Sequence, residues 1–170
     1  VDVQRAIYLS STAVYGFQPD LTADAPSAPE NGYGTSKLLG EQYFNQLRQT
    51  GKDIHILRSG QVFGANRTMR FDTVVHSFFF EALTRGRLLV HGNGQQTRAF
   101  MPLGSLVTDL VNRISGGEAT QEPVLLASFQ SAIQDLLAWM TSANPNLEYR
   151  YISPNIALPS QSFQHLPDLD

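Results

Sequence analysis

The sequence contains no cysteine among its 170 residues. This absence excludes a disulfide-stapled fold and any chemistry that needs a thiolate. Two other patterns are missing as well. The four histidines are scattered without H-E-x-x-H spacing, and no G-x-S-x-G occurs. We therefore expect neither a metal centre nor a serine-hydrolase site.

Charge of one sign is not in excess, because 12 basic and 15 acidic residues leave a formal net charge of −3. This balance gives no electrostatic argument for binding nucleic acid or an anionic membrane. No apolar run has transmembrane length, and no cationic, apolar signal sequence opens the chain. We therefore expect no nucleic-acid or membrane partner, and the lack of cysteine is compatible with a cytoplasmic location. The length allows one domain with a sizeable core.

The most informative stretch of the chain is Ile7–Glu41. It opens with a short apolar run, typical of a buried strand, that ends in a cluster of hydroxyl side chains. Residues 17–32 are rich in proline and lack periodicity, which indicates a surface loop. Apolar residues then recur at helical spacing over 33–49, which predicts a helix.

Tyr33 and Lys37 stand four residues apart in this predicted helix, so both side chains leave the same face. A lysine ammonium beside a phenol stabilises the phenolate, which suits a tyrosine to proton transfer near neutral pH. Ser11, at the end of the preceding strand, offers a hydroxyl for the same reacting oxygen. A Tyr-x-x-x-Lys spacing also arises by chance, so this pair alone is weak evidence.

The motifs around this pair make the pattern more specific. The chain resembles the extended short-chain dehydrogenase/reductase family, and within it the nucleotide-sugar epimerases and dehydratases, over roughly residues 5–115. The motifs that carry the resemblance are Ser-Ser-Thr-Ala-Val-Tyr-Gly at 10–16, Tyr-Gly-Thr-Ser-Lys at 33–37, Leu-Arg at 57–58 with Val-Phe-Gly at 62–64, Gly-Asn-Gly-Gln at 92–95, and Arg98 with Phe100.

The resemblance implies an α/β fold: part of a Rossmann-type doubly wound parallel sheet with a small C-terminal substrate-binding lobe. It also implies an NAD- or NADP-dependent reaction at a carbon of a nucleotide-linked sugar. Tyr33 would then transfer the proton, Lys37 would hold the nicotinamide ribose, and Ser11 would bind the reacting oxygen, with Thr12 beside the substrate. Dehydratases of this family carry an acidic pair where this chain has Thr12 and Ala13, so an epimerase or reductase is favoured.

Further ligand contacts are expected where the second strand ends, because ligands bind at the carboxyl edge of a parallel sheet. Ser59 and Gly60 are candidate cofactor contacts there. Gln61 stands where the family usually has a diphosphate-binding asparagine, and its longer side chain makes that contact uncertain. His76 has either a substrate role or a packing role, and Arg98 is either a diphosphate ligand or a solvated charge.

One family feature is missing, because no G-x-x-G-x-x-G phosphate loop occurs near a first strand. The chain therefore looks like the second half of a larger protein, which by resemblance would be a homodimer. We expect residues 1–64 to complete the dinucleotide-binding domain and residues 65–170 to form the substrate lobe and the last sheet elements. The alternative is a truncated or divergent module that binds no cofactor, has little activity alone, and associates or is unstable.

Secondary structure follows from local patterns. The sequence predicts parallel strands at 5–11 and 53–58, with His55 as a structural residue inside the second. Residues 59–71 are expected to form loops, and Asp72 is expected to cap a helix that ends near Thr84. Further helices are expected at 106–114 and 132–140, and strands at 87–91, 123–127 and 147–152. The tail is expected to be loosely structured.

Overall fold

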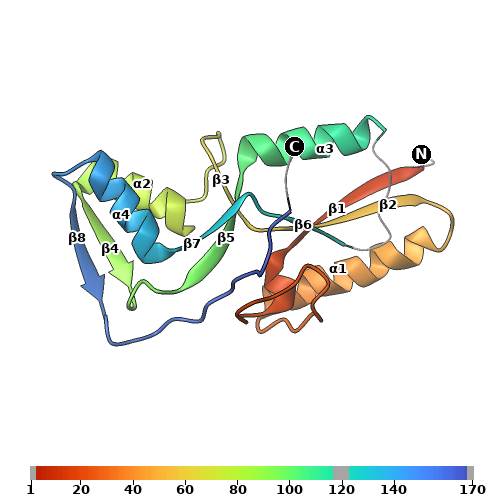
Figure 1. Ribbon diagram of the computed structural model, residues 1–170. Coiled ribbons are helices and arrows are strands. Elements are labelled where there is room, and N and C mark those ends of the chain that lie inside the picture. The colour runs from red at the N-terminus through yellow and green to blue at the C-terminus, as the bar shows by residue number, and fades with distance from the viewer. Residues whose placement is uncertain (1–2, 117–122, 168–170) are drawn as a thin grey trace.

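The computed structural model describes residues 3–116 and 123–167. It has four α-helices and eight strands in these ranges (Figure 1). The elements in chain order are β1 (Arg5–Ser11), the 3-10 turn η1 (Thr12–Tyr15), α1 (Gly32–Arg48), β2 (Asp53–Ser59), β3 (Gln61–Phe63), α2 (Val74–Arg85), β4 (Arg87–His91), β5 (Thr97–Pro102), α3 (Leu103–Ile114), β6 (Val124–Leu126), β7 (Phe129–Ala132), α4 (Ile133–Ala143) and β8 (Glu148–Ile152).

The first sheet has the order β1-β2-β6, and all its strands are parallel. In β1 and β2 every residue pairs in register from Arg5 with Asp53 to Ser11 with Ser59. Helices α1 and α3 cover opposite faces of this sheet in Figure 1. The expected α/β class and the parallel pair of central strands are thus confirmed.

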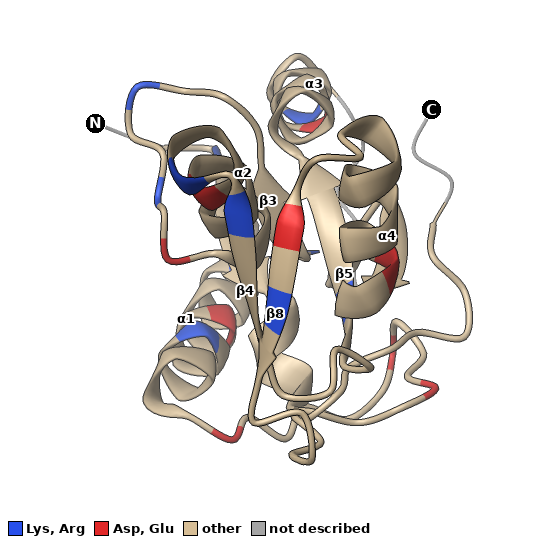
Figure 2. Cartoon of the chain, turned by 90° about the vertical axis from the view of Figure 1, so that its left-hand side faces the viewer, with Lys and Arg blue, Asp and Glu red and all other residues tan. Residues whose placement is uncertain are grey.

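The second part of the molecule is a lobe built from α2, α4 and the parallel pair β4–β8 (Figure 1). It has its own apolar core, in which Phe78 and Leu88 pack with Leu137. Figure 2 shows that basic and acidic positions alternate over this end of the molecule, without a patch of one sign. The boundary expected at residue 64 stays a prediction.

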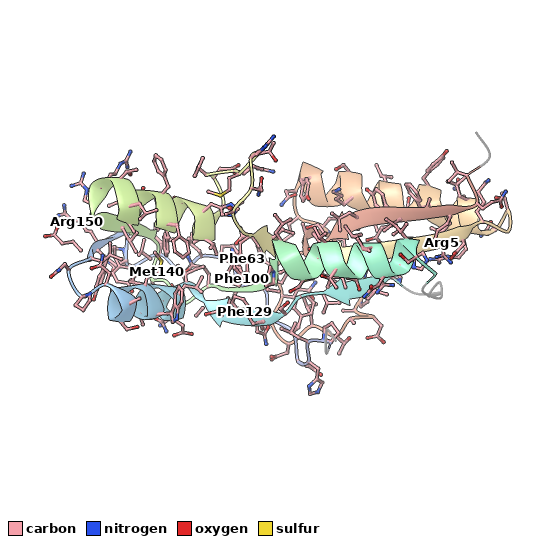
Figure 3. The ribbon with its side chains drawn as sticks, turned by 90° about the horizontal axis from the view of Figure 1, so that it is seen from above. Arg5, Phe63, Phe100, Phe129, Met140 and Arg150 are labelled. Atoms are coloured by element: carbon pink, nitrogen blue, oxygen red, sulfur yellow. The ribbon has the colours of Figure 1, made fainter. Side chains whose placement is uncertain are left out.

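A third sheet, in the order β3-β5-β7, joins the two parts. Three phenylalanines, one from each strand, meet on this sheet: Phe63, Phe100 and Phe129 lie together between the two ends of the molecule (Figure 3), and Phe100 is the buried one. Phe100 stacks on Phe129 at 5.2 Å between ring centroids, and Phe63 meets both rings edge-on. Because β3 is a strand, the expectation of an unbroken loop after Ser59 was wrong.

Several local expectations differ from the structure. Helix α2 is preceded by Thr73, whereas Asp72 pairs with Arg70 two residues earlier. Helix α3 begins at Leu103, three residues before its expected start, and α4 extends to Ala143. The tail is not loose over its described part, because its backbone bonds to residues 18, 21 and 97; residues 168–170 lie outside the described ranges.

Helix α1 also buries a face that differs in part from the one its apolar stripe suggests. Its buried residues are Gly34 and Glu41, while Leu39 and Tyr43 are each 59% exposed. Leu38, Phe44 and Leu47 of the stripe are half-buried; Leu38 packs on a core cluster, and the Phe44 ring stacks on Tyr8 of β1. Part of the apolar stripe is therefore exposed, and the most buried side chain of the helix is a carboxylate.

Candidate functional site

All nine residues predicted for the site line one cavity of about 760 Å³. They come from the carboxyl ends of β1 and β2 and the residues that follow these strands, from the first turns of α1 and α2, and from the start of β5. The nine are Ser11, Thr12, Tyr33, Lys37, Ser59, Gly60, Gln61, His76 and Arg98. The cavity thus gathers residues up to 87 positions apart in sequence at the carboxyl edge of the parallel sheet, where ligands of such folds bind.

Helix α1 begins at the cavity because Asn31 caps it. The Asn31 side-chain oxygen accepts a hydrogen bond from the Gly34 backbone N–H at 2.8 Å. This cap fixes the first turn, which carries Tyr33, and Asn31 itself lines the cavity. The Tyr33 side chain is 55% exposed, so its phenol is accessible from the cavity mouth.

Lys37 reaches from α1 to the end of β1. Its ammonium donates to the Leu9 carbonyl at 2.9 Å and lies 5.7 Å from the Tyr33 ring centroid and 5.3 Å from that of Tyr8. Both separations are in the range of cation–π attraction. Burial raises the pKa of Tyr8, and the charge of Glu41 acts in the same direction. Tyr8 therefore stays a neutral phenol beside Lys37, and Tyr33 is the phenol that opens to the cavity.

The two serines at the end of β1 have different partners. Ser10 is buried and donates its hydroxyl to the Glu41 carboxylate at 2.6 Å. Ser11 instead accepts a bond from the Ala13 backbone N–H at 3.2 Å, which makes it the N-cap of η1. An accepted bond leaves the Ser11 hydroxyl proton available to donate. Of the pair, Ser11 is the hydroxyl that can serve a reacting oxygen.

The residues after β2 approach β5 closely. A side chain at Gly60 would place its Cβ 2.8 Å from the Ala99 carbonyl oxygen, so only glycine fits there without displacement. The Ser59 hydroxyl donates to the Gly60 carbonyl at 3.0 Å. The side-chain oxygen of Gln61 is buried and has no hydrogen-bond partner within residues 3–116 and 123–167. A buried unpaired oxygen is costly, and a hydroxyl of a bound ligand would satisfy it.

Arg98 lines the cavity, and its side chain is hydrogen-bonded to backbone carbonyls. Its Nη1 donates to the carbonyls of Thr97 and Pro159, both at 2.8 Å, and its guanidinium carbon lies 4.9 Å from the Phe17 ring centroid. Burial lowers the pKa of Arg98. The group keeps its positive charge at neutral pH, and a second charge of opposite sign, such as a phosphate, would offset its burial.

His76 is engaged by the backbone on both sides of its ring. Nε2 accepts a bond from the Gly64 N–H at 3.0 Å, so the proton sits on Nδ1, which donates to the Arg70 carbonyl at 2.9 Å. Thr73 lies 3.1 Å from the same Nδ1. His76 therefore fastens both ends of the 64–70 loop over the cavity, and its predicted contact with substrate stays a prediction.

The structure adds lining residues that the sequence did not reveal. Gln161 comes from the tail, and Phe17 and Glu30 come from the proline-rich loop, where Glu30 accepts a bond from the Phe17 N–H at 2.8 Å. None has a motif or a periodicity that marks it in the sequence. His55 is fully buried in β2, away from the cavity, as expected of a structural residue.

Among the residues that the structure describes, no group of three or more histidine, aspartate and glutamate side chains is placed to hold a metal ion. No helix in residues 3–116 and 123–167 has the length and apolar character to cross a membrane.

The chain is similar to curated and solved proteins that are named as enzymes of UDP-linked sugars. UDP-glucuronic acid decarboxylase 1 of Xenopus tropicalis is 30% identical over 116 residues, which are 63% of this chain and 27% of that protein. A putative UDP-glucose 4-epimerase of Methanocaldococcus jannaschii is 32% identical over 110 residues, covering 62% and 36%. The chain thus spans about a third of the length of these relatives.

The structural comparison extends over almost the whole chain. UDP-glucuronic acid 4-epimerase from Bacillus cereus, solved with UDP-glucuronic acid and NAD, has a TM-score of 0.82 at 22% identity, covering 99% of this chain and 54% of that one. At that identity the likeness shows the Rossmann-like fold. The profile of one family, the NAD dependent epimerase/dehydratase family, matches residues 1–114. The chain therefore belongs to the NAD dependent epimerase/dehydratase family.

Proposed function

We propose that this chain forms the catalytic and substrate-binding part of an NAD(P)-dependent nucleotide-sugar epimerase or reductase. The observation that carries the proposal is that Ser11, Tyr33 and Lys37 line the same cavity at the carboxyl edge of the sheet. Three polar groups of these types suit proton transfer at a sugar hydroxyl. The family membership supports the same reaction class.

The chain's residues fit one end of a nicotinamide cofactor. The cavity offers the Lys37 ammonium, the Tyr33 phenol, and the Ser59–Gly60 segment where backbone approaches closely. These donors and acceptors match ribose hydroxyls and a carboxamide. When bound, NAD or NADP supplies hydride transfer to or from the sugar carbon. The phosphate loop that would hold the other end is not among the motifs of this sequence.

Each residue then has a task that its chemistry allows. Tyr33 in its phenolate form accepts the proton of the sugar hydroxyl, and Lys37 stabilises that phenolate before the transfer. Ser11 donates a hydrogen bond to the reacting oxygen. Thr12 and Gln61 contact the sugar nucleotide, and Arg98 pairs with its diphosphate.

The proposal extends to the type of reaction, the oligomeric state and the location of the complete protein. Thr12 and Ala13 offer neither acid nor base for elimination of water, which favours epimerisation or reduction over dehydration. Exposed Leu39 and Tyr43 on α1 offer an apolar surface for a homodimer of the complete protein. A cytoplasmic location suits a protein that uses a soluble nucleotide sugar.

The experiment is to replace Tyr33 by phenylalanine in a version of the chain extended upstream and to assay turnover of UDP-glucose and UDP-glucuronic acid with NAD. Tyr43→Phe is the matched control, because Tyr43 lies on the same helix but does not line the cavity. We expect Tyr33→Phe to lower kcat about 10²–10⁴-fold, the contribution of a general acid or base, and Tyr43→Phe to leave it unchanged. Equal activity of both variants would remove Tyr33 from the mechanism.

Binding of NADH, measured by calorimetry, separates this function from its alternative. Strand β1 pairs with β2 on one side only among the described strands, so the chain alone has an open sheet edge. We expect binding by a version extended upstream and little by these 170 residues. Absence of binding by both would favour a non-catalytic module that keeps the fold.

A further inference from the structure

The tail of the chain packs back against the molecule, and one of its residues, Gln161, lines the cavity. Residues 159–164, here called the tail segment, have no regular secondary structure apart from an isolated bridge between Phe163 and Leu21. They nevertheless contact both walls of the site. Phe163 is 2% exposed and packs edge-on against the buried Tyr15, at 5.5 Å between ring centroids. Two side chains of the tail segment, Gln161 and Phe163, are therefore buried like core residues.

One side of the tail segment is hydrogen-bonded to Thr97 and Arg98 of β5. The Ser160 hydroxyl accepts from the Thr97 N–H at 2.7 Å, and the Gln161 N–H donates to the Thr97 carbonyl at 3.1 Å. The Pro159 carbonyl accepts from Arg98 at 2.8 Å. These bonds fix the tail segment to β5 beside the residue proposed to bind diphosphate.

The other side holds the turn that follows Ser11. The Gln161 side-chain amide donates two hydrogen bonds, to the carbonyls of Thr12 at 2.8 Å and Gly16 at 2.6 Å. These carbonyls mark the two ends of η1, whose N-cap is Ser11. Gln161 is 5% exposed, so both bonds are shielded from water.

The opposite side of η1 is held by α1. A Cβ at Gly34 would lie 2.5 Å from the Ala13 carbonyl oxygen, so the first turn of the helix rests directly on η1. The turn is thus enclosed between the helix that carries Tyr33 and the amide of Gln161. Loss of the amide would remove a buried donor from each of these two carbonyls and free η1 to move away from the helix.

We propose that Gln161 is a positioning residue for the reaction, which acts through η1 to hold Ser11 against Tyr33. This inference rests on the proposed function. It makes the tail segment a part of the active site that links the reacting end of the cavity to Arg98. A shift of about 1 Å in such a group is enough to lower a rate by about 10²-fold.

The test compares Gln161→Met with Gln130→Met in the complete protein that contains this chain. Methionine keeps the length of glutamine and removes its hydrogen bonds. Gln130 is a matched control, because its side chain makes two bonds of 2.8 Å with the backbone of Phe163 in the same tail segment but does not line the cavity. A purely structural role predicts similar effects for both.

With UDP-glucuronic acid as substrate, we expect Gln161→Met to lower kcat 10- to 100-fold while KM changes less than threefold, since Arg98 keeps its contacts. Gln130→Met should lower Tm by a comparable amount and leave kcat within twofold. Equal kcat values for the two variants would overturn the proposal.

Hydrogen exchange provides a readout that does not need turnover. Amides of residues 12–16 should exchange at least tenfold faster in Gln161→Met and at an unchanged rate in Gln130→Met. Unchanged exchange in Gln161→Met would overturn the role of Gln161 even in an active protein. A wild type without turnover would instead reject the proposed function, and faster exchange would still support the hold of Gln161 on η1.

Discussion

Arg58 and Glu41 form a two-bonded ion pair beneath the serine end of β1. The Arg58 Nε donates to Glu41 Oε1 at 2.9 Å, and Nη2 donates to Oε2 at 2.7 Å. The two side chains are 9% and 4% exposed. Burial works against the charge of Arg58, but its bonds to Glu41 outweigh that cost, and the pKa of the guanidinium is raised. This pair joins β2 to α1 through the interior.

The pair also organises its neighbours. Glu41 accepts the hydroxyl of Ser10, the residue before Ser11, and Arg58 donates to the Ser27 hydroxyl at 3.0 Å. The guanidinium carbon lies 4.7 Å from the Tyr15 ring centroid. Strand, helix, loop and η1 therefore meet at two charged residues, which explains why α1 buries a glutamate in addition to part of its apolar stripe.

Breaking this pair from one side should be expensive. We expect Glu41→Leu or Arg58→Leu to lower the free energy of unfolding by about 3–5 kcal/mol, because each leaves an uncompensated buried charge. The double variant should lose less than the sum of the singles, since neither charge then remains. Urea unfolding of the three variants measures the cycle.

The exposed pair Arg70–Asp72 is the control for that cycle, since its side chains are 74% and 63% exposed. Asp72→Asn should leave the free energy of unfolding unchanged within error, because solvent screens an exposed pair. Additive losses at Glu41 and Arg58 would contradict the coupling inferred from the geometry.

Two glycines of the first turn of α1 should respond oppositely to alanine. Gly32 has open space where a Cβ would stand, whereas a Cβ at Gly34 would meet the Ala13 carbonyl oxygen at 2.5 Å. We expect Gly32→Ala to stabilise the chain by up to about 1 kcal/mol through helix propensity. Gly34→Ala should destabilise it by about 1–3 kcal/mol, as overpacking does.

Thermal unfolding and turnover together test this pair. Gly34 follows Tyr33 in the helix and packs against η1, so its replacement should shift Tyr33 and lower kcat. Gly32→Ala should leave kcat unchanged. Similar stability for both variants would mean that the helix start can shift without strain, and the close contact would then carry no functional weight.

The sequence predicted those parts of the fold that depend on local pattern. Residues 5–11 and 53–58 have the apolar, β-branched character of central strands, and they pair in parallel as expected. The i, i+4 spacing of Tyr33 and Lys37 is a property of any helix, so their shared face followed directly. Placement after a parallel strand also predicted that Ser59, Gly60 and Gln61 lie at a ligand-binding edge, and these residues line the cavity, whereas His76 and Arg98 were placed there by the family resemblance.

Features set by tertiary contacts escaped prediction. Strands β3 and β7 have three and four residues, too few for a recognisable period, and exist because β5 pairs with both. Glu41 is buried only because Arg58 arrives from another element to neutralise it. The tail segment has no pattern of its own, and its order comes from bonds to residues between 33 and 149 positions away.

The histidine inside β2 gives a prediction about pH. His55 is fully buried, and burial lowers its pKa, because a charged imidazolium would lose its hydration there. Asp53 lies 3.4 Å from its Nε2 and favours the charged form, while Arg113 and Arg5 oppose it. The net result is a neutral imidazole within the sheet.

The sign of the effect follows from linkage. In the unfolded chain the imidazole titrates near its ordinary pKa of about 6.5. Below that pH the unfolded state therefore binds a proton that the native state does not bind. Stability is therefore greatest above that pH and falls as the pH falls toward the lowered pKa of the native state. Urea unfolding at pH 8, 6.5 and 5 measures this loss.

His55→Leu is the matched variant: the free energy of unfolding of the wild type relative to this variant should decrease on acidification, because only the wild type carries the titrating ring. A wild-type advantage that grows at low pH would mean that Asp53 stabilises an imidazolium within the sheet, and the neutral state inferred for His55 would be wrong.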